Sequence, residues 1–207
     1  MPKNKNLLVT GFLPFQGEKI NPSQRLAQEL SRKFKILHLI LPVSYKIAYV
    51  RLEEFILREL QSKKAVDFCL MLGQAGGRRK IGIERIALNL EDSSLKDEDA
   101  DFANDREIVE GAPLALRSNL DLSSFCKGID PSVIDISNSA GTFVCNSIYY
   151  RCLFEKQISK KFSGTQFSFV HVPQFPEQNS ETFRGSDGID FDTSLTALSQ
   201  LVSNIQS

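Results

Sequence analysis

The sequence contains only two histidines, no long apolar stretch and no excess of charge of either sign. Its 25 Lys and Arg residues balance 25 Asp and Glu residues, so its charge favours neither nucleic acid nor an anionic membrane as a partner. A bilayer span needs about 20 apolar residues, and a signal peptide needs an apolar stretch of roughly 7–15. The polar residues 1–6 lead into only four apolar or small residues. We therefore expect neither export nor membrane insertion.

Cysteines are few and widely spaced. The chain has four, and none forms a Cys-x-x-Cys pair, so a disulfide framework is not expected and the reducing cytoplasm is the expected compartment. No two Cys or His residues share one element at a metal-ligand spacing, which argues against a metal site. We expect Cys69 in the core, Cys126 in a loop and Cys152 in a helix.

Short apolar runs alternate along the chain with amphipathic segments. The runs predict strands over residues 7–10, 34–41, 66–72, 83–90, 133–137 and 167–172. Helices are expected after the N-cap pair Asn21-Pro22, after Ser44, over 113–120 and 142–154, and from near Asp192. The acidic, polar residues 91–107 are typical of a surface loop.

This alternation predicts an α/β fold: one domain over residues 1–207, built as a three-layer α/β/α sandwich around a largely parallel sheet. In such sheets ligands collect at the carboxyl ends of the strands. Four unusual segments follow predicted strands, namely residues 12–17, 73–77, 141–145 and 171–173. The glycine-rich 73–77 lacks the lysine and hydroxyl of a P-loop, so a tight turn is a better interpretation than a phosphate site.

Cys145 is the strongest candidate for a catalytic residue. It lies just after a predicted strand, at the start of a predicted helix. The free N–H groups and positive dipole at a helix N-terminus favour a thiolate and can also receive the oxyanion formed when the thiolate attacks a carbonyl.

A nucleophilic thiol also needs a base and a group to orient that base. His38 stands in the middle of an apolar strand, where a structural or solvent-facing role is expected, whereas His171 ends a strand and can pair with Cys145. Glu84 is the candidate for the orienting role. The alternative for Glu84, an ion pair with Arg85, stays open at this point.

Aromatic residues occur in three of the loops at the predicted strand ends. Phe12, Phe15 and Phe143 lie outside the periodic core patterns. Each one alone is compatible with ordinary core packing. Together they could line a small apolar pocket.

Five segments resemble the pyrrolidone-carboxylate peptidases (pyroglutamyl-peptidase I), a family of cysteine peptidases. In chain order they are TGFLPFQGEKINPS (10–23), LGQAGGR (72–78), IERIALN (83–89), SNSAGTFVCN (137–146) and HVPQFPEQ (171–178). The resemblance implies a triad of Glu84, Cys145 and His171 and removal of an N-terminal pyroglutamyl residue from peptides, without a cofactor. It also implies that Phe12, Phe15, Phe143, Val144 and Gln74 bind the substrate, and that the protein forms a homotetramer.

Two departures from the family pattern stand out. Ser94 occupies the place of an arginine that family members commonly carry after the IERxAxN strand, and Gln16 replaces a glycine of the first motif. Two alternatives to the peptidase therefore stay open. One is a catalytically weak relative that binds peptides or a partner protein through the same pocket, and the other is a thiol amidase acting on another lactam or cyclic imide.

Overall fold

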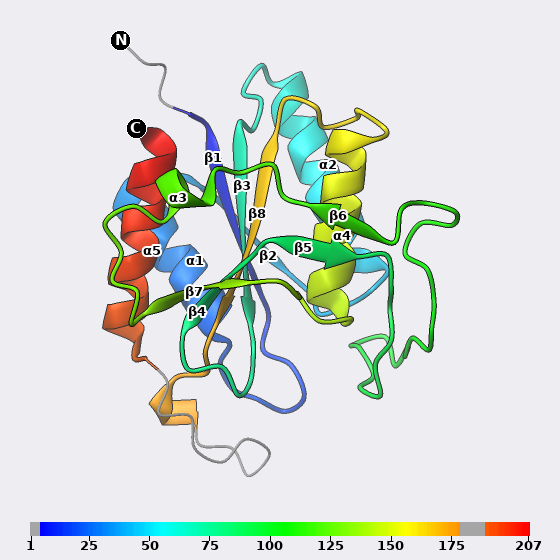
Figure 1. The fold of residues 1–207 in the computed structure, drawn as a ribbon, viewed down its shortest axis with the longest axis horizontal. Coiled ribbons are helices and arrows are strands. Elements are labelled where there is room, and N and C mark those ends of the chain that lie inside the picture. The colour runs from blue at the N-terminus through cyan, green and yellow to red at the C-terminus, as the bar shows by residue number, and fades with distance from the viewer. Residues whose placement is uncertain (1–4, 179–188) are drawn as a thin grey trace.

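The computed structural model describes residues 5–178 and 189–207 (Figure 1). Residues 1–4, part of the polar start used above to argue against a signal peptide, lie outside the described residues. The main sheet contains β1 (Leu7–Phe12), β2 (Leu37–Leu41), β3 (Phe68–Gln74), β4 (Ile81–Glu84), β7 (Ile134–Ser137) and β8 (Gln166–Val172). Their spatial order is β2-β1-β3-β8-β4-β7.

Helices cover both faces of this sheet, which confirms the predicted three-layer sandwich. One face carries α1 (Pro22–Phe34), the short α3 (Leu122–Phe125) and α5 (Phe191–Gln206), and the other carries α2 (Ile47–Gln61) and α4 (Val144–Gln157) (Figure 1). A 3-10 turn, η1 (Pro176–Gln178), follows β8. No helix in the described part of the chain combines the length and apolar character that a bilayer span requires.

Strand residues alternate between two hydrophobic cores, as the pleat of a sheet requires. Leu70, Leu72 and Val170 belong to the core under α1 and α5, whereas Met71 and Phe169 belong to the core under α2 and α4. The odd-numbered residues of β3 and β8 therefore face α2 and α4, and the even-numbered apolar residues face α1 and α5. This parity decides which polar side chains can meet.

The caps that the sequence predicts are present at two helices. The Asn21 side chain accepts a hydrogen bond from Ser23 N at the start of α1, with Pro22 in the first helical turn. The Ser44 hydroxyl accepts one from Ile47 N at the start of α2. These side chains replace partners that a helix N-terminus lacks.

One strand direction differs from the expectation. Strands β2, β1, β3 and β8 are parallel, but β4 pairs antiparallel with β8, and β7 follows the direction of β4. The carboxyl end of β7 therefore points away from those of β3 and β8. Residues 138–143 lead from its end to Cys145, so the argument from strand ends was wrong for this one segment.

Two predicted elements were wrong. In place of one strand over residues 83–90 the chain forms two, β4 (Ile81–Glu84) and β5 (Ile86–Leu88), and residues 113–120 contain the strand β6 (Ala115–Arg117) in place of a helix. β5 and β6 pair with each other in a separate two-stranded sheet. Pairing with β5 outweighs the helix propensity of Ala-Leu-Arg, because propensity is a weak preference that tertiary contacts override.

The acidic segment 91–107 lacks regular helix or strand, as expected, but it is anchored at several points. Glu91 and Arg106 form an isolated backbone bridge, and the Asp97 carboxylate accepts hydrogen bonds from Tyr45 N and Asp99 N. Asp92 N donates to Thr142 O at 3.1 Å. The segment is therefore tied directly to the turn that precedes Cys145.

Candidate active site

Cys145 occupies the second position of α4, where the sequence places it. Helix α4 begins at Val144, and the Phe143 N-cap is extended and makes no side-chain cap hydrogen bond. Gly141 enters the turn with φ of +78°, in the left-handed region that favours glycine. No side chain of the N-cap residue therefore binds the first N–H groups of α4, which lie beside the Cys145 sulfur.

Gly73 shows where the sulfur lies relative to the sheet. A Cβ added to Gly73 would lie 2.9 Å from Cys145 Sγ, so the sulfur rests directly over this glycine. Gly73 is the register partner of His171 in the β3–β8 pair, and paired residues project to the same face. The Cys145 sulfur, which lies over β3, and the His171 ring of β8 are therefore on the same face of the sheet. Adjacent strands such as β3 and β8 are about 4.8 Å apart.

Glu84 meets His171 from the neighbouring strand. In the β4–β8 register Gly82 opposes His171 and Glu84 opposes Phe169, so Glu84 and His171 are diagonal neighbours on the α4 face. His171 Nδ1 lies 2.7 Å from Glu84 Oε1. With Nδ1 donating to the carboxylate, Nε2 is the nitrogen that can accept a proton.

The ion pair of Glu84 is not the one weighed from the sequence. Its cationic partner is Arg78, whose Nη2 lies 2.8 Å from Glu84 Oε1. Arg85 Nε is buried without a hydrogen-bond partner in the described part of the chain. Because successive strand residues point to opposite faces, Arg85 is poorly placed to reach the carboxylate that precedes it, and that alternative was wrong.

Burial favours the neutral forms of both Cys145 and His171. Burial, followed by the Glu84 charge, raises the pKa of Cys145 to about 12, against the lowering effects of Arg78 and of the residue's own N–H. Burial lowers the pKa of His171 below 6.5, although its contact with Glu84 acts in the opposite direction. Desolvation therefore acts against the thiolate that the helix N-terminus favours.

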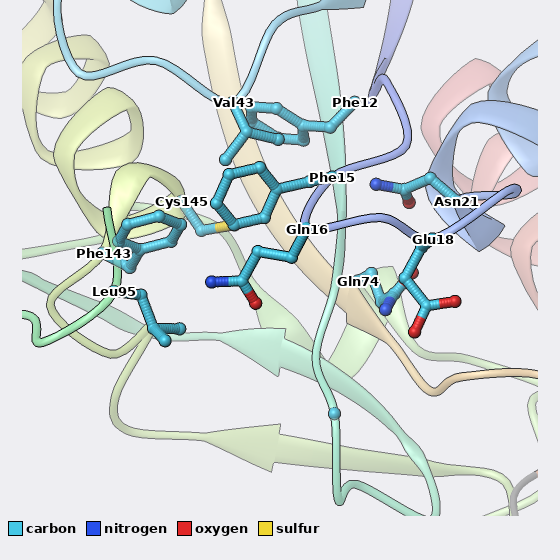
Figure 2. Close-up of a pocket in the computed structure, with 11 residues that line it drawn as sticks. Phe12, Phe15, Gln16, Glu18, Asn21, Val43, Gln74, Leu95, Phe143 and Cys145 are labelled. Carbon is cyan, nitrogen blue, oxygen red and sulfur yellow. The ribbon is translucent and has the colours of Figure 1, made fainter. Parts of the chain in front are cut away.

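The sulfur faces a small aromatic cavity (Figure 2). The cavity has a volume of about 170 Å³, similar to the engineered cavity of about 150 Å³ that holds one benzene molecule. The Phe15 and Phe143 rings lie 5.6 Å apart between centroids. The lining residues are Phe12, Phe15, Gln16, Glu18, Asn21, Val43, Gln74, Gly76, Leu95, Phe143 and Cys145.

Gln74 presents a defined polar group to this cavity. Gln178 Nε2 donates to Gln74 Oε1 and to Ile20 O, each at 3.3 Å, while Gln178 Oε1 accepts from Phe175 N at 2.8 Å. With its oxygen engaged, Gln74 has its Nε2 as the donor for a ligand carbonyl. The amide of Gln178 therefore fixes the polarity of Gln74.

The structure brings seven of the eight residues predicted for the site to this region and leaves one side chain out. Val144 is 1% exposed and packs in the hydrophobic core under α4, so its side chain does not line the cavity. His38 is exposed on β2 and lies 3.0 Å from Ser31 Oγ, which fits the solvent-facing role expected for it. The described residues contain no group of three or more His, Cys, Asp or Glu side chains suited to a metal ion.

Comparison with known proteins decides the family. The family model described as pyroglutamyl peptidase matches residues 5–206. The chain belongs to the pyroglutamyl peptidase family, a family of cysteine peptidases. It is 38% identical over 179 residues to the pyrrolidone-carboxylate peptidase of Fusobacterium nucleatum, covering 84% of this chain and 80% of the relative. It is 39% identical over 172 residues to that of Thermosipho melanesiensis, covering 81% and 82%.

Solved pyroglutamyl peptidase structures share the fold over nearly the whole chain. The pyrrolidone carboxyl peptidase of Fervidobacterium islandicum superposes with a TM-score of 0.86 at 30% identity, covering 97% of this chain and 98% of that one. The pyroglutamyl peptidase I of Bacillus amyloliquefaciens gives a TM-score of 0.87 at 28% identity, covering 98% and 95%.

Of the two departures from the family pattern, Gln16 lines the cavity and Ser94 is the chain neighbour of a residue that does. Ser94 is exposed, and its neighbour Leu95 lines the cavity although the side chain is 45% exposed. Gln16 has φ of +54°, the backbone conformation that the family glycine would adopt without strain. Gln16 therefore retains a glycine-like loop geometry and adds an amide to the cavity wall.

Three residues near the reacting groups were missed or given another role from sequence. Gly73 was interpreted as part of a turn, yet a glycine inside a strand is a signal of close approach by another group. Arg78 and Gln178 fall within quoted motifs, but their roles depend on contacts with residues 84 and 74. No spacing along the chain could indicate those contacts.

Proposed function

We propose that this protein removes an N-terminal pyroglutamyl residue from peptides, with Cys145 as nucleophile, His171 as base and Glu84 as the group that orients the base. The observation that carries the proposal is the buried His171–Glu84 pair beside a sulfur that faces a ring-sized aromatic cavity. The names of the relatives, pyrrolidone-carboxylate and pyroglutamyl peptidases, support the same substrate.

The first half of the reaction acylates the enzyme. His171 Nε2 takes the Cys145 proton as Sγ attacks the pyroglutamyl carbonyl, and the N–H groups at the start of α4 stabilise the oxyanion. Collapse of this intermediate breaks the C–N bond, and His171 gives its proton to the leaving amine. A thioester on Cys145 remains.

The second half releases pyroglutamate. His171 removes a proton from water as the oxygen attacks the thioester carbonyl, the C–S bond then breaks, and His171 returns the proton to Cys145 Sγ. A neutral thiol and a neutral imidazole at rest suit this sequence, because proton transfer then accompanies attack. Glu84 stabilises the imidazolium that forms in each half.

Recognition depends on the ring, because a pyroglutamyl terminus has no free amine for an acidic side chain to bind. Phe12, Phe15 and Phe143 enclose the lactam, and Gln74 Nε2 donates to a carbonyl of the same residue. Ligands that leave this half-buried donor unpaired are disfavoured. We assign Val144 only a backbone contribution at the helix N-terminus.

The remaining features follow from family likeness. We propose peptides with N-terminal pyroglutamate as the only partners needed for activity, a homotetrameric assembly, a cytoplasmic location and one peptidase domain over residues 1–207. The match of the family model to residues 5–206 supports the single domain. Light scattering after size-exclusion chromatography tests the tetramer.

Turnover of a fluorogenic pyroglutamyl amide under reducing conditions tests the function. The wild-type chain is expected to release the amine, and Cys145→Ser is expected to abolish release. Cys126→Ser, which changes a half-buried cysteine on the opposite face of the sheet from Cys145, is the matched control and keeps full activity. Absence of turnover from folded wild-type protein would contradict the peptidase assignment and favour the binding-only relative.

A further inference from the structure

Glu84 has an unusual set of partners for a fully buried carboxylate. Its side chain is 0% exposed, and Oε2 has no hydrogen-bond partner in the described part of the chain. Both polar contacts converge on Oε1, from His171 Nδ1 at 2.7 Å and from Arg78 Nη2 at 2.8 Å. A buried carboxylate is costly unless it is paired, so these two contacts are the ones that stabilise it.

Two hydrogen bonds hold Arg78 in place, and the lack of a side chain on Gly82 leaves room for its guanidinium. Its Nη2 also donates to Ser137 Oγ at 3.3 Å and to Ser139 O at 3.1 Å. A Cβ on Gly82 would lie 2.0 Å from Arg78 Nη1, so only glycine leaves room for the guanidinium. The glycine in β4 therefore leaves the space in which the Arg78 guanidinium reaches Glu84.

Other groups around the pair do not replace this cation. On α4, the Tyr149 hydroxyl donates to the Glu84 backbone oxygen at 3.0 Å, not to its carboxylate, and Cys145 is neutral at rest. Arg85 follows Glu84 in the chain, but its buried Nε makes no hydrogen bond in the described part of the chain. From β7 only the neutral Ser137 reaches the guanidinium.

We propose that Arg78 is a positioning residue that holds the Glu84 carboxylate in place and aims it at His171 Nδ1, so that Nε2 stays available to take the Cys145 proton. The inference rests on the proposed function only for its turnover assay. Arg78 does not touch the cavity that binds the substrate, so its loss should affect proton transfer more than binding. Its charge also lowers the pKa of both Cys145 and His171.

Arg78→Met tests the proposal, with Arg78→Lys as the variant that keeps the charge. We expect Arg78→Met to lower kcat about 10- to 100-fold with KM unchanged, less than the 10²–10³-fold lost with a direct oxyanion donor. The Arg78 charge lowers the pKa of His171, so without this cation His171 binds a proton more readily. The acid limb of kcat/KM should therefore move to higher pH and return toward the wild-type position in Arg78→Lys.

Lys80→Met is the matched control, because it removes a cation two residues away that contacts Pro131 O and Asp135. It should leave kcat and the pH profile unchanged. A wild-type kcat and acid limb in folded Arg78→Met would overturn the proposal. If Arg78→Met does not fold, Arg78→Lys decides: a wild-type acid limb supports the role of the charge, and a displaced one refutes it.

Alkylation of Cys145 by iodoacetamide separates this inference from the function itself, because it needs no substrate. The rate at Cys145 is followed by peptide mass spectrometry, which resolves it from the three other cysteines. Its acid limb should shift upward in Arg78→Met even if the protein hydrolyses no pyroglutamyl amide. Identical alkylation profiles in wild type and Arg78→Met would refute the role of Arg78 whatever the substrate.

Discussion

A methyl group added at Gly73 should displace the nucleophile. The Cβ of Gly73→Ala would lie 2.9 Å from Cys145 Sγ and 2.8 Å from the Phe169 ring, whereas optimal contacts between carbon atoms are about 3.5–4.0 Å. The sulfur or the ring must therefore move by roughly 0.6–1 Å. The Phe169 ring centroid lies 4.9 Å from that of His171, so a movement of the ring reaches the base.

Two magnitudes follow for Gly73→Ala. A misplacement of about 1 Å at a reacting group can cost on the order of 10²-fold in rate, which we expect in kcat/KM. Overpacking a core by one methyl group typically costs about 1–3 kcal/mol. In a chain of this length that cost corresponds to a fall in Tm of about 2–12 °C.

Gly164→Ala is the control for this prediction, because a Cβ there meets no atom within 4 Å and the glycine has no positive φ. Turnover of the pyroglutamyl amide and thermal melts are measured on wild type and both variants. The reasoning fails if Gly73→Ala keeps wild-type kcat/KM, since the sulfur would then not rest over Gly73.

Three further predictions concern the base, the cavity and the frame of the site. Because His171 must be neutral to act and burial lowers its pKa, kcat/KM should fall as the pH drops through a midpoint below 6.5; a midpoint above 7 in the pH–rate profile would contradict this. Gln178→Glu keeps the acceptor for Phe175 N but removes the donor to Gln74, so KM should rise about 10-fold, as expected for one hydrogen bond, and an unchanged KM would refute the orienting role. Asn146 makes three hydrogen bonds to Leu88 and Leu90, so Asn146→Ala should lower the free energy of unfolding by about 2–4 kcal/mol; denaturant unfolding with an unchanged midpoint would show that these bonds contribute little.

Much of the site could be predicted from sequence because its residue types are rare and occupy special positions. Only two histidines exist, and only His171 ends a strand at the α4 side of the sheet. Cys145 follows a turn and opens a helix. Glu84 is a charge inside an apolar strand, which in a buried sheet requires a partner.

The errors share one cause, which is dependence on contacts between distant segments. The strand at 115–117 exists because β5 lies beside it, and the direction of β7 follows from pairing with β4. The pKa of Cys145 depends on how many side chains exclude water from it, and Arg78 reaches Glu84 only because Gly82 is bare. Neither the local spacing of residues nor their helix and strand propensities predict these contacts.

Trapping the acyl-enzyme tests the central claim most directly. A pyroglutamyl amide is mixed with the protein, the reaction is quenched in acid during turnover, and the modified peptide is identified by mass spectrometry. We predict one pyroglutamyl group on Cys145, none on the other three cysteines, and none anywhere in Cys145→Ser. Turnover by Cys145→Ser, or an acyl group on a different residue, would contradict the assignment of Cys145 as the nucleophile.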